Sequence, residues 1–263
     1  MTESMPTEVR RERMLGMLQE QEFARVAELA EAFGVSSVTA RADLDALEEQ
    51  GKVRRVRGGA VAATPALGTE PSFELSLGEM AVEKALIARA AARLIGSGES
   101  VLMGAGTTTA YVARELVARA DLAEVTVFTN GLRTALELEP ALPRFNVVVT
   151  GGSLRRQQHS LVDPLGTKIL ENIRANTVIF GCGGIHPEAG MTNLNLPDAE
   201  MKQRMVRAAT RRIVVADSSK LGVIEMAPIC ALTDVDLLIT GESADPAIVA
   251  DLRDRGLKIE IAS

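Results

Sequence analysis

Hydrophobic residues at the start of the chain recur at the spacing of short helices. After Pro6, apolar side chains at helical intervals predict a first helix that ends near Gln21. The stretch "VAELAEAF", residues 26–33, places apolar residues at i, i+3, i+4 and i+7, and Gly34 follows in a position that commonly ends a helix. Two helices are therefore expected before a tight turn.

A third helix is expected directly after this turn. Ser36 or Ser37 can cap its first turn through the side-chain oxygen, and Gly51 ends it. Period 3.6 divides its side chains between an inner and an outer face. Those expected to point inward are Val38, Leu44 and Leu47, and those expected to point elsewhere are Thr39, Arg41 and Asp45. The pattern predicts a helix-turn-helix.

A short hairpin is expected after the third helix. The run "KVRRV", residues 52–56, alternates apolar and basic side chains with the period of two that is typical of a strand. The letters "RGG" then indicate a turn, and "AVA", residues 60–62, returns as a second strand. The hairpin would form a wing beside the helix-turn-helix.

Positive charge is concentrated in this hairpin. The whole chain has a net charge of -6, and residues 1–62 hold 9 Lys and Arg against 11 Asp and Glu. From Gly51 to Ala62, however, there are four cations and no acid, whereas four carboxylates lie in the helix before it. The positive surface is therefore local, as a contact of the size of a DNA groove requires.

The hydroxyl-tipped helix and the basic hairpin together indicate a surface for double-stranded DNA. The start of the third helix can enter a major groove, where hydroxyls contact phosphates or base edges and an arginine binds a guanine. Each piece alone is better explained as an ordinary capped helix or a solvated hairpin, but their order favours DNA. The expected DNA-binding residues are Ser36, Ser37, Thr39, Arg41, Arg54, Arg55 and Arg57.

Beyond a linker predicted at residues 63–77, the hydrophobic pattern changes. Apolar, β-branched runs such as "SVLMG", "VTVFTN" and "NTVIFGC" alternate with helical stretches such as "EKALIARAAARLI". This alternation predicts a mostly parallel sheet covered by helices, because strands buried on both faces appear as continuous apolar runs. We therefore expect an α/β protein with a DNA-binding domain at 6–62 and a second domain at 78–263.

The ends of the predicted parallel strands carry glycines, hydroxyls and a lysine. Free backbone N–H groups, hydroxyls and a lysine at the carboxyl ends of such strands can form an anion site, to which a helix start adds a favourable dipole. For any single cluster, a strand-to-helix turn with a cap is the better explanation. The four clusters at one edge together favour an anion site and ordinary capped turns about equally. The clusters are Gly104, Gly106, Thr107, Thr108 and Thr109; Thr129 and Asn130; Gly151, Gly152 and Ser153; and Asp217, Ser218, Ser219 and Lys220.

Composition and missing motifs exclude several kinds of site. Two cysteines and two histidines cannot form a disulfide framework or a spaced metal site, so no metal or cofactor is expected in a reduced, cytoplasmic protein. The charged N-terminus is unlike a signal peptide, and no apolar run reaches the ~20 residues of a membrane span. The partial G-x-G-x-x-G at residues 104–109 is weak evidence for a dinucleotide, and no Walker motif occurs. A compact phosphate fits better.

The N-terminal motifs resemble the winged helix-turn-helix of DeoR-family bacterial repressors. The run "VAELAEAFGVSSVTARADLDALEEQGKVRRVRGGAV" is similar to that family's V-S-x-x-T-I-R-R-D-L helix and R-x-H-G-G-A wing. The resemblance implies that Ser36, Thr39, Arg41 and a wing tip of Arg57, Gly58 and Gly59 contact operator DNA. In this chain Ala40 replaces the usual isoleucine, Ala42 the second arginine and Arg57 the histidine.

Residues 73–261 resemble the DeoR-family sensor domain, whose fold is similar to ribose-5-phosphate isomerase and whose effectors are usually phosphorylated sugars. "GTTT", "TN", "TGG", "GMTNLNLPDAEMKQRM" and "ADSSK" occur in the expected order. Gly104 and Gly183 stand where the family often has aspartates. The resemblance implies that Gly106 to Thr109, Gly151, Gly152 and Lys220 hold a phosphate, with Thr129, Asn130 and Asp217 nearby.

These patterns lead to a DNA-binding regulator, expected to be a homodimer or homotetramer, that responds to a phosphorylated sugar or a related anion. A sugar-phosphate isomerase is one alternative, in which Lys220 and Asp217, with Asp198 and Glu200 behind them, would be catalytic. The absent acids at Gly104 and Gly183 count against catalysis, so no catalytic residue and no enzyme are expected. In another alternative the large domain only joins DNA-binding domains together.

Overall fold

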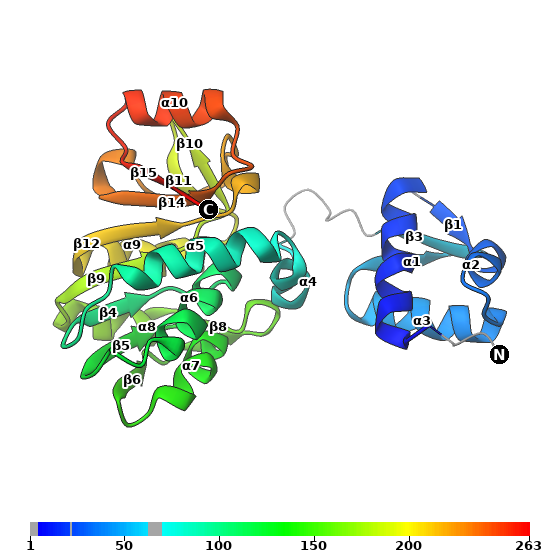
Figure 1. Ribbon diagram of the computed structural model, residues 1–263, viewed down its shortest axis with the longest axis horizontal. Helices are drawn as coiled ribbons and strands as arrows, with labels where there is room; N and C mark the ends of the chain where they lie inside the picture. Colours follow the sequence, from blue (N-terminus) through cyan, green and yellow to red (C-terminus); the bar gives the residue numbers. More distant parts are fainter. Residues whose placement is uncertain (1–4, 22, 63–69) are drawn as a thin grey trace. The chain divides into compact units, whose positions relative to one another are not determined.

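The structure is a computed structural model that describes residues 5–21, 23–62 and 70–263. The chain divides into two compact units, Met1–Leu75 and Ser76–Ser263 (Figure 1). Within the described ranges, no helix is long and apolar enough to cross a membrane.

The N-terminal unit is a winged helix-turn-helix. Its described elements are α1 (Thr7–Gln21), β1 (Phe23–Arg25), α2 (Val26–Ala32), α3 (Ser37–Glu49), β2 (Val53–Val56) and β3 (Gly59–Ala62). The strands form an antiparallel sheet in the order β1-β3-β2, and β2 and β3 are the two strands of the wing. The predicted helices and wing strands are confirmed. The sequence pattern does not predict β1, because three residues are too few to show a period.

Helix α3 buries a different stripe of side chains from the one expected. Leu44 and Leu47 are fully buried as predicted, but Val38 is 73% exposed, so the prediction that it points inward was wrong. The third buried apolar residue is Ala40, which lies four residues before Leu44 and therefore one helical turn from it. Val38 lies six residues before Leu44, which turns it away from the core.

The wing approaches strand β1 so closely that it requires a glycine. A Cβ atom on Gly59 would lie 2.2 Å from the carbonyl oxygen of Ala24 and 2.8 Å from the ring of Phe23. Gly58, at the tip of the wing, has φ +87°, in the left-handed region that favours glycine. The two glycines of "RGG" therefore set the turn of the wing and its contact with β1.

The C-terminal unit is built on a seven-stranded sheet whose adjacent strands are all parallel. The strand order is β15-β14-β12-β9-β4-β5-β6. The bounds are β4 (Ser100–Met103), β5 (Val125–Thr129), β6 (Phe145–Val149), β9 (Ala175–Phe180), β12 (Ala209–Val215), β14 (Leu237–Gly241) and β15 (Ile259–Ala262). The parallel α/β fold predicted from apolar runs is thus confirmed.

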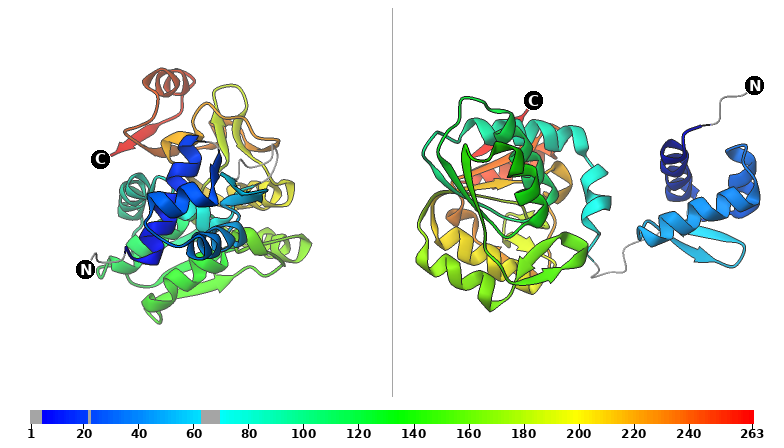
Figure 2. Two further views of the ribbon diagram at one scale, coloured as in Figure 1. Left: turned by 90° about the vertical axis from the view of Figure 1, so that its right-hand side faces the viewer. Right: turned by 90° about the horizontal axis from the view of Figure 1, so that it is seen from below.

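Helices cover both faces of this sheet (Figure 2). The core on one face contains side chains of α5 (Ala81–Arg93), α6 (Thr107–Ala118) and α7 (Leu132–Leu138). The core on the other face contains side chains of α9 (Leu196–Arg207), α10 (Pro246–Asp254) and a small sheet of β10 (Gly184–His186), β11 (Gly190–Asn193) and β13 (Ala227–Cys230). The large sheet therefore lies between two apolar layers.

The remaining described elements connect these layers. They are α4 (Phe73–Gly78), α8 (Pro164–Lys168), the hairpin of β7 (Ser153–Arg155) and β8 (Ser160–Val162), and the 3-10 helices η1 (Glu139–Ala141), η2 (Arg156–Gln158), η3 (Ile169–Asn172), η4 (Ser218–Lys220) and η5 (Leu232–Asp234). Residues 63–69 of the predicted linker lie outside the described residues. Residues 73–77, the last part of that linker, lie in α4, where Phe73 is buried.

The connectivity of the large sheet has one reversal. The chain starts at β4, continues outward through β5 and β6, and then returns with β9 to the other side of β4. From β9 it proceeds outward through β12, β14 and β15. In open α/β sheets, ligands bind beyond the carboxyl ends of the strands at such a reversal. The loops after β4 and β9 are therefore the first place to look for a ligand site.

Candidate functional sites

The start of α3 presents hydroxyl groups and an arginine to solvent. Ser36 is the N-cap, because its Oγ accepts a hydrogen bond from the backbone N–H of Thr39 at 3.0 Å and lies 2.9 Å from Thr39 Oγ1. Ser37, the first residue of α3, and Arg41, one helical turn later, are both exposed. This end of the helix therefore combines a fixed cap with polar side chains that can reach a ligand.

The cations of the wing divide into two groups. Arg54 and Arg57 are exposed, as a contact with DNA phosphate requires. Arg55 instead forms an ion pair with Asp45 of α3, and its backbone N–H donates to Glu48 Oε1 at 2.7 Å. Arg55 was grouped with the DNA-contacting cations, but in this structure it joins the wing to α3.

A buried ion-pair cluster fixes α3 against α1. Asp43 is 2% exposed, and its two carboxylate oxygens accept hydrogen bonds from Arg10 Nε at 2.6 Å and from Arg11 Nε at 2.9 Å. Burial on its own would raise the pKa of Asp43, but the hydrogen bonds and charges of the two arginines outweigh it and lower the pKa. The orientation of α3 thus depends on a charged carboxylate.

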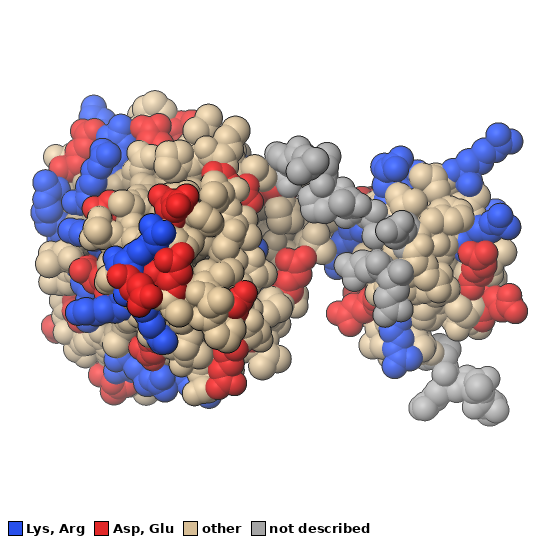
Figure 3. Space-filling model, turned by 90° about the horizontal axis from the view of Figure 1, so that it is seen from above, with Lys and Arg blue, Asp and Glu red and all other residues tan. Residues whose placement is uncertain are grey.

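One face of the N-terminal unit carries both acidic and basic side chains. In the view of Figure 3, Lys and Arg side chains of this unit stand among Asp and Glu side chains, without a broad area of one sign. This agrees with the near balance of charge in residues 1–62. Contact with DNA would therefore depend on where individual cations lie.

In the C-terminal unit, glycine loops flank the reversal of the sheet. Gly104 follows β4 and packs so closely on β9 that a Cβ atom there would lie 3.2 Å from Phe180 Cβ. The loop Gly181–Gly183 follows β9, and Gly106 precedes α6, which has no side-chain cap. The first N–H groups of α6 are therefore candidates for binding an anion at this place.

Several residues predicted to bind the effector instead hold the strand-end loops together. Asn130 is 0% exposed; its Oδ1 accepts from the backbone N–H of Ala105 at 2.8 Å, and its Nδ2 donates to the carbonyl of Leu161 at 3.0 Å. Thr129 is also fully buried, and its Oγ1 donates to the carbonyl of Met103 at 2.7 Å. The buried Thr109 hydroxyl donates to the carbonyl of Gly106 at 2.9 Å. These three side chains position the loops.

Asp217 likewise contacts protein groups. Its Oδ1 accepts from the backbone N–H and the hydroxyl of Ser219, and its Oδ2 lies 3.7 Å from Lys84 Nζ. Lys84 is 3% exposed and donates to the carbonyls of Ser76 and Glu79. Burial is the main reason that the pKa of Lys84 is lowered, and the charge of nearby Lys220 lowers it further. A buried cation and anion thus support the loop that carries Lys220.

Most of the other predicted effector residues remain accessible to a ligand. Gly151 and Gly152 are exposed, Thr107 is partly exposed, and Thr108 is buried at the start of α6. Lys220 is partly buried at the end of η4, and none of the described residues forms an ion pair with it. These residues lie at the carboxyl ends of β4, β6 and β12, on the same edge of the sheet.

A second group of polar residues lies beside this edge, and among them only Asp198 was expected from the sequence to belong to a site. Asp198 Oδ2 accepts hydrogen bonds from Lys202 Nζ and Asn193 Nδ2, both at 2.8 Å, and Arg155 Nη1 lies 3.8 Å from Asp198 Oδ1. Lys202 is only 5% exposed. The sequence signal for an ion pair of Lys202 with Asp198 was the position of Lys202 in α9, four residues after Asp198. Lys202 also directly follows the buried Met201. Asn195 caps α9, because its side-chain oxygen accepts a hydrogen bond from the backbone N–H of Asp198.

Cys182 lies in the glycine loop after β9, within electrostatic range of Lys202 in this group. Burial raises the pKa of the Cys182 thiol to about 12, while the charges of Lys202 and Lys220 act on the thiol in the opposite direction. Both lysines are therefore close enough to act electrostatically on one loop, which lies at the reversal of the sheet. The thiol stays protonated near neutral pH, so it is not the reactive group of this site.

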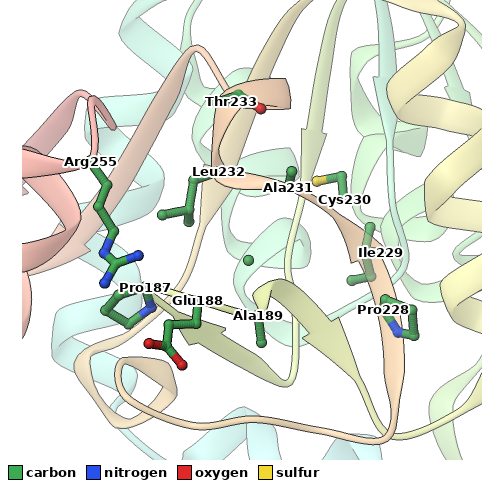
Figure 4. A pocket seen from close by; sticks show the side chains of 11 residues that line it. Pro187, Glu188, Ala189, Pro228, Ile229, Cys230, Ala231, Leu232, Thr233 and Arg255 are labelled. Carbon is green, nitrogen blue, oxygen red and sulfur yellow. The ribbon is translucent and has the colours of Figure 1, made fainter.

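Two surface cavities are lined by none of the predicted effector residues. One, of about 420 Å³, lies between the β10–β11 turn, β13 and Arg255, and Figure 4 shows Arg255 extending over Pro187. The other, of about 550 Å³, lies between α8 and α9 and is lined by Leu196, Glu200 and Arg204 among others. Glu200 forms an ion pair there with Arg204 at 3.0 Å. Within the described residues there is no group of three or more metal-ligating side chains.

Comparison with known proteins gives the same division of the chain. Residues 10–66 match the DeoR-like helix-turn-helix domain, and residues 79–242 match the DeoR C terminal sensor domain. Relatives include the uncharacterized HTH-type transcriptional regulator YulB of Bacillus subtilis, with 36% identity over 89% of each chain. HTH-type transcriptional regulator GolR of Listeria innocua is 32% identical over 96% of this chain and 98% of its own. A putative aga operon transcriptional repressor of Escherichia coli O157:H7 is 34% identical, with coverages of 96% and 93%.

Solved structures give a weaker likeness. Ribose 5-phosphate isomerase A of Methanocaldococcus jannaschii aligns over 52% of each chain, with 17% identity and a TM-score of 0.38. A probable sor operon regulator of Shigella flexneri aligns over 66% of this chain and 89% of its own, with 12% identity and a TM-score of 0.44.

Proposed function

The chain belongs to the DeoR family of DNA-binding transcriptional regulators, and from this premise we propose that it represses a carbohydrate-catabolic operon until a phosphorylated sugar releases it. Family membership extends over both units, and the relatives are named as regulators rather than enzymes. The expectation of a regulator is thereby confirmed. One relative is named as a repressor of an operon, and the role of this chain as the repressor of an operon is inferred by analogy with it.

The DNA contact is proposed to be made by the start of α3 and the outer side of the wing. The observation that carries it is that Arg41, Arg54 and Arg57 are exposed while Ser36 fixes the helix start. Gly58, which is exposed at the tip of the wing, would bring the backbone close to phosphate, whereas Gly59 is buried against β1 and would support the tip. Arg55 would act indirectly, by holding the wing against α3 through Asp45.

Replacing Arg41 by alanine is expected to weaken binding to a selected operator duplex by about 1–3 kcal/mol, because a bidentate arginine–guanine contact contributes that much discrimination. Binding to random duplexes should change less. Arg41→Lys keeps the charge but not the planar fork, so it should retain affinity for random duplexes and lose discrimination. Fluorescence anisotropy on both duplexes measures the difference. Equal losses on both would make Arg41 a phosphate contact instead.

The effector is proposed to bind at the reversal of the sheet. Its phosphate would accept hydrogen bonds from the first N–H groups of α6, from Thr107 and Thr108 and from the loop of Gly151 and Gly152, with Lys220 as a counter-charge. Asn130 and Asp217 would shape the site from behind. Lys202 would add positive charge from α9. A compact anion with hydroxyl groups fits this set of donors.

Coupling between the two sites is proposed to follow from binding linkage. An effector that binds the DNA-incompetent arrangement more tightly lowers operator affinity, and the operator lowers effector affinity by the same factor. A symmetric homodimer or homotetramer would place two helix-turn-helix units at a fixed spacing on two half-sites. Such a protein would act in the cytoplasm, together with the DNA it binds.

Replacing Lys220 by methionine is expected to leave operator binding unchanged and to weaken the effector about ten- to a hundredfold, because a hydrogen bond to a charged group contributes about 1.5–3 kcal/mol. A panel of sugar phosphates, screened by thermal stabilisation of the full chain, would first supply the ligand. Calorimetry on the variant then measures the loss. Lys258→Met is the matched control, because Lys258 is exposed and lies at the amino end of β15, whereas the proposed effector site lies at the carboxyl ends of the strands. Equal ligand affinity in both variants would remove Lys220 from the site.

A further inference from the structure

The first turn of α3 carries an exposed valine between its polar groups. Val38 is 73% exposed, compared with 40% for Val9 and 39% for Phe23, the other large hydrophobic residues that are exposed in the described part of the N-terminal unit. It is the second residue of α3, directly after Ser37. An isolated exposed valine is ordinary on a protein surface. Its position at the end of the helix that faces DNA makes it informative.

Val38 and its neighbours form a small apolar strip on the outer face of α3. Ala42 lies one helical turn further on, is also exposed and has no long side chain that could cover Val38. Arg41 is three residues from Val38 and lies beside the strip. A β-branched side chain in a helix has one strongly preferred rotamer, so the two methyl groups of Val38 are held in place before DNA arrives. The outer face therefore offers a rigid apolar contact next to a guanidinium.

The chemistry of base edges limits what such a strip can bind. In the major groove, bases present hydrogen-bond donors and acceptors, and the apolar group among them is the 5-methyl of thymine. Valine can neither donate nor accept a hydrogen bond, so a polar base edge pressed against it would lose its water without gaining a partner. A thymine methyl would instead be buried at no such cost.

We infer that Val38 determines operator specificity by packing on the 5-methyl group of a thymine in each half-site, with Ala42 leaving room for that contact. The inference rests on the proposed entry of α3 into the major groove. Arg41, three residues on, would bind a guanine close to that thymine in the same half-site. The operator should then contain a thymine and a guanine within a few base pairs of each other.

Uracil substitution isolates the methyl group. Duplexes are first enriched from a randomised pool by the full chain, and each thymine of the enriched site is then replaced singly by deoxyuridine, which removes only the methyl group. At one position per half-site the wild-type protein should bind the uracil duplex about fourfold more weakly, the equivalent of one buried methylene. If no position shows a loss, the inference is overturned.

The Val38→Ala variant assigns the methyl contact to its side chain. This variant should bind the thymine duplex about as weakly as the wild type binds a duplex in which the contacted thymine of both half-sites is replaced by uracil, and it should show no further loss with uracil. Val9→Ala is the matched control, because Val9 is a partly exposed valine on α1, and it should keep the full discrimination. A variant at Val38 that still distinguishes thymine from uracil as the wild type does would overturn the inference.

Failure of the inference is distinguishable from failure of DNA binding itself. A protein that enriches no sequence from the pool would contradict the proposed DNA contact as a whole. A protein that enriches a site but shows equal affinity for its thymine and uracil forms would contradict only the role of Val38. Circular dichroism of Val38→Ala should match the wild type, since the position is exposed and alanine favours helix.

Discussion

Replacing Asp43 by asparagine is expected to lower the free energy of unfolding of the N-terminal unit by about 3–5 kcal/mol, because it removes one partner from a buried ion pair. Asp43 accepts hydrogen bonds from Arg10 and Arg11, and Arg10 is itself buried. Asparagine can offer only one acceptor oxygen and no charge. The guanidinium of Arg10 would remain buried without its counter-charge, and α1 would lose its link to α3.

Hydrogen exchange measured by mass spectrometry on the full chain separates the two units in this test. Amides of α1 and α3 should lose protection in Asp43→Asn, while amides of β4 and β9 should not change. Asp45→Asn is the matched control, because its ion pair with Arg55 is on the surface and such pairs contribute at most about 1 kcal/mol. Unchanged protection of α1 in Asp43→Asn would show that the cluster is not needed for stability.

The same cluster predicts how the N-terminal unit responds to acid. The folded pKa of Asp43 lies below its ordinary value of 3.8, so folding favours the charged form. The contribution of Asp43 to stability is therefore fully present above the unfolded pKa and is lost as the pH falls through the folded pKa. In Asp43→Asn this part of the acid dependence should be absent.

Replacing Asn130 by alanine is expected to destabilise the C-terminal unit by about 2–5 kcal/mol. The change leaves the N–H of Ala105 and the carbonyl of Leu161 without their side-chain partner, and each unsatisfied buried group costs about 1–3 kcal/mol. These groups belong to the loop after β4 and to strand β8. The loops that form the proposed effector site would therefore loosen together, and thermal stabilisation by an effector would decrease.

Thermal unfolding of the full chain, followed separately for each unit by hydrogen exchange, measures this effect. Asn146→Ala is the control, because Asn146 is an exposed asparagine on the neighbouring strand β6 and its loss should change stability by no more than about 0.5 kcal/mol. If Asn130→Ala were as mild as Asn146→Ala, the loops would not depend on this side chain.

Much of the fold was predictable because burial leaves a period in the sequence. The stripe of Leu44 and Leu47 and the continuous apolar strands of the large sheet both have this origin. The prediction for Val38 is wrong because a hydrophobic side chain indicates burial only where it falls on the inward stripe, and that stripe passes through Ala40. Alanine gives a weak signal, so the correct register of α3 needed the packed structure.

The candidate sites were only partly predictable, because chemical type does not show what a side chain contacts. Arg55 and Arg57 look equivalent in the sequence, yet Arg55 pairs with Asp45, ten residues away in the chain. Asn130 belongs to a polar cluster at a strand end, but its hydrogen bonds are internal. Lys202 was missed because lysines are usually exposed, and its burial depends on Asp198.

Fluorescence anisotropy of the full chain, on an enriched duplex and on a scrambled duplex of equal composition at one moderate salt concentration, measures sequence-specific DNA binding directly. A regulator that uses α3 and the wing as proposed should bind the enriched duplex at least about a thousandfold more tightly. Equal affinity for the two duplexes would contradict the assignment of this chain's N-terminal unit to operator recognition.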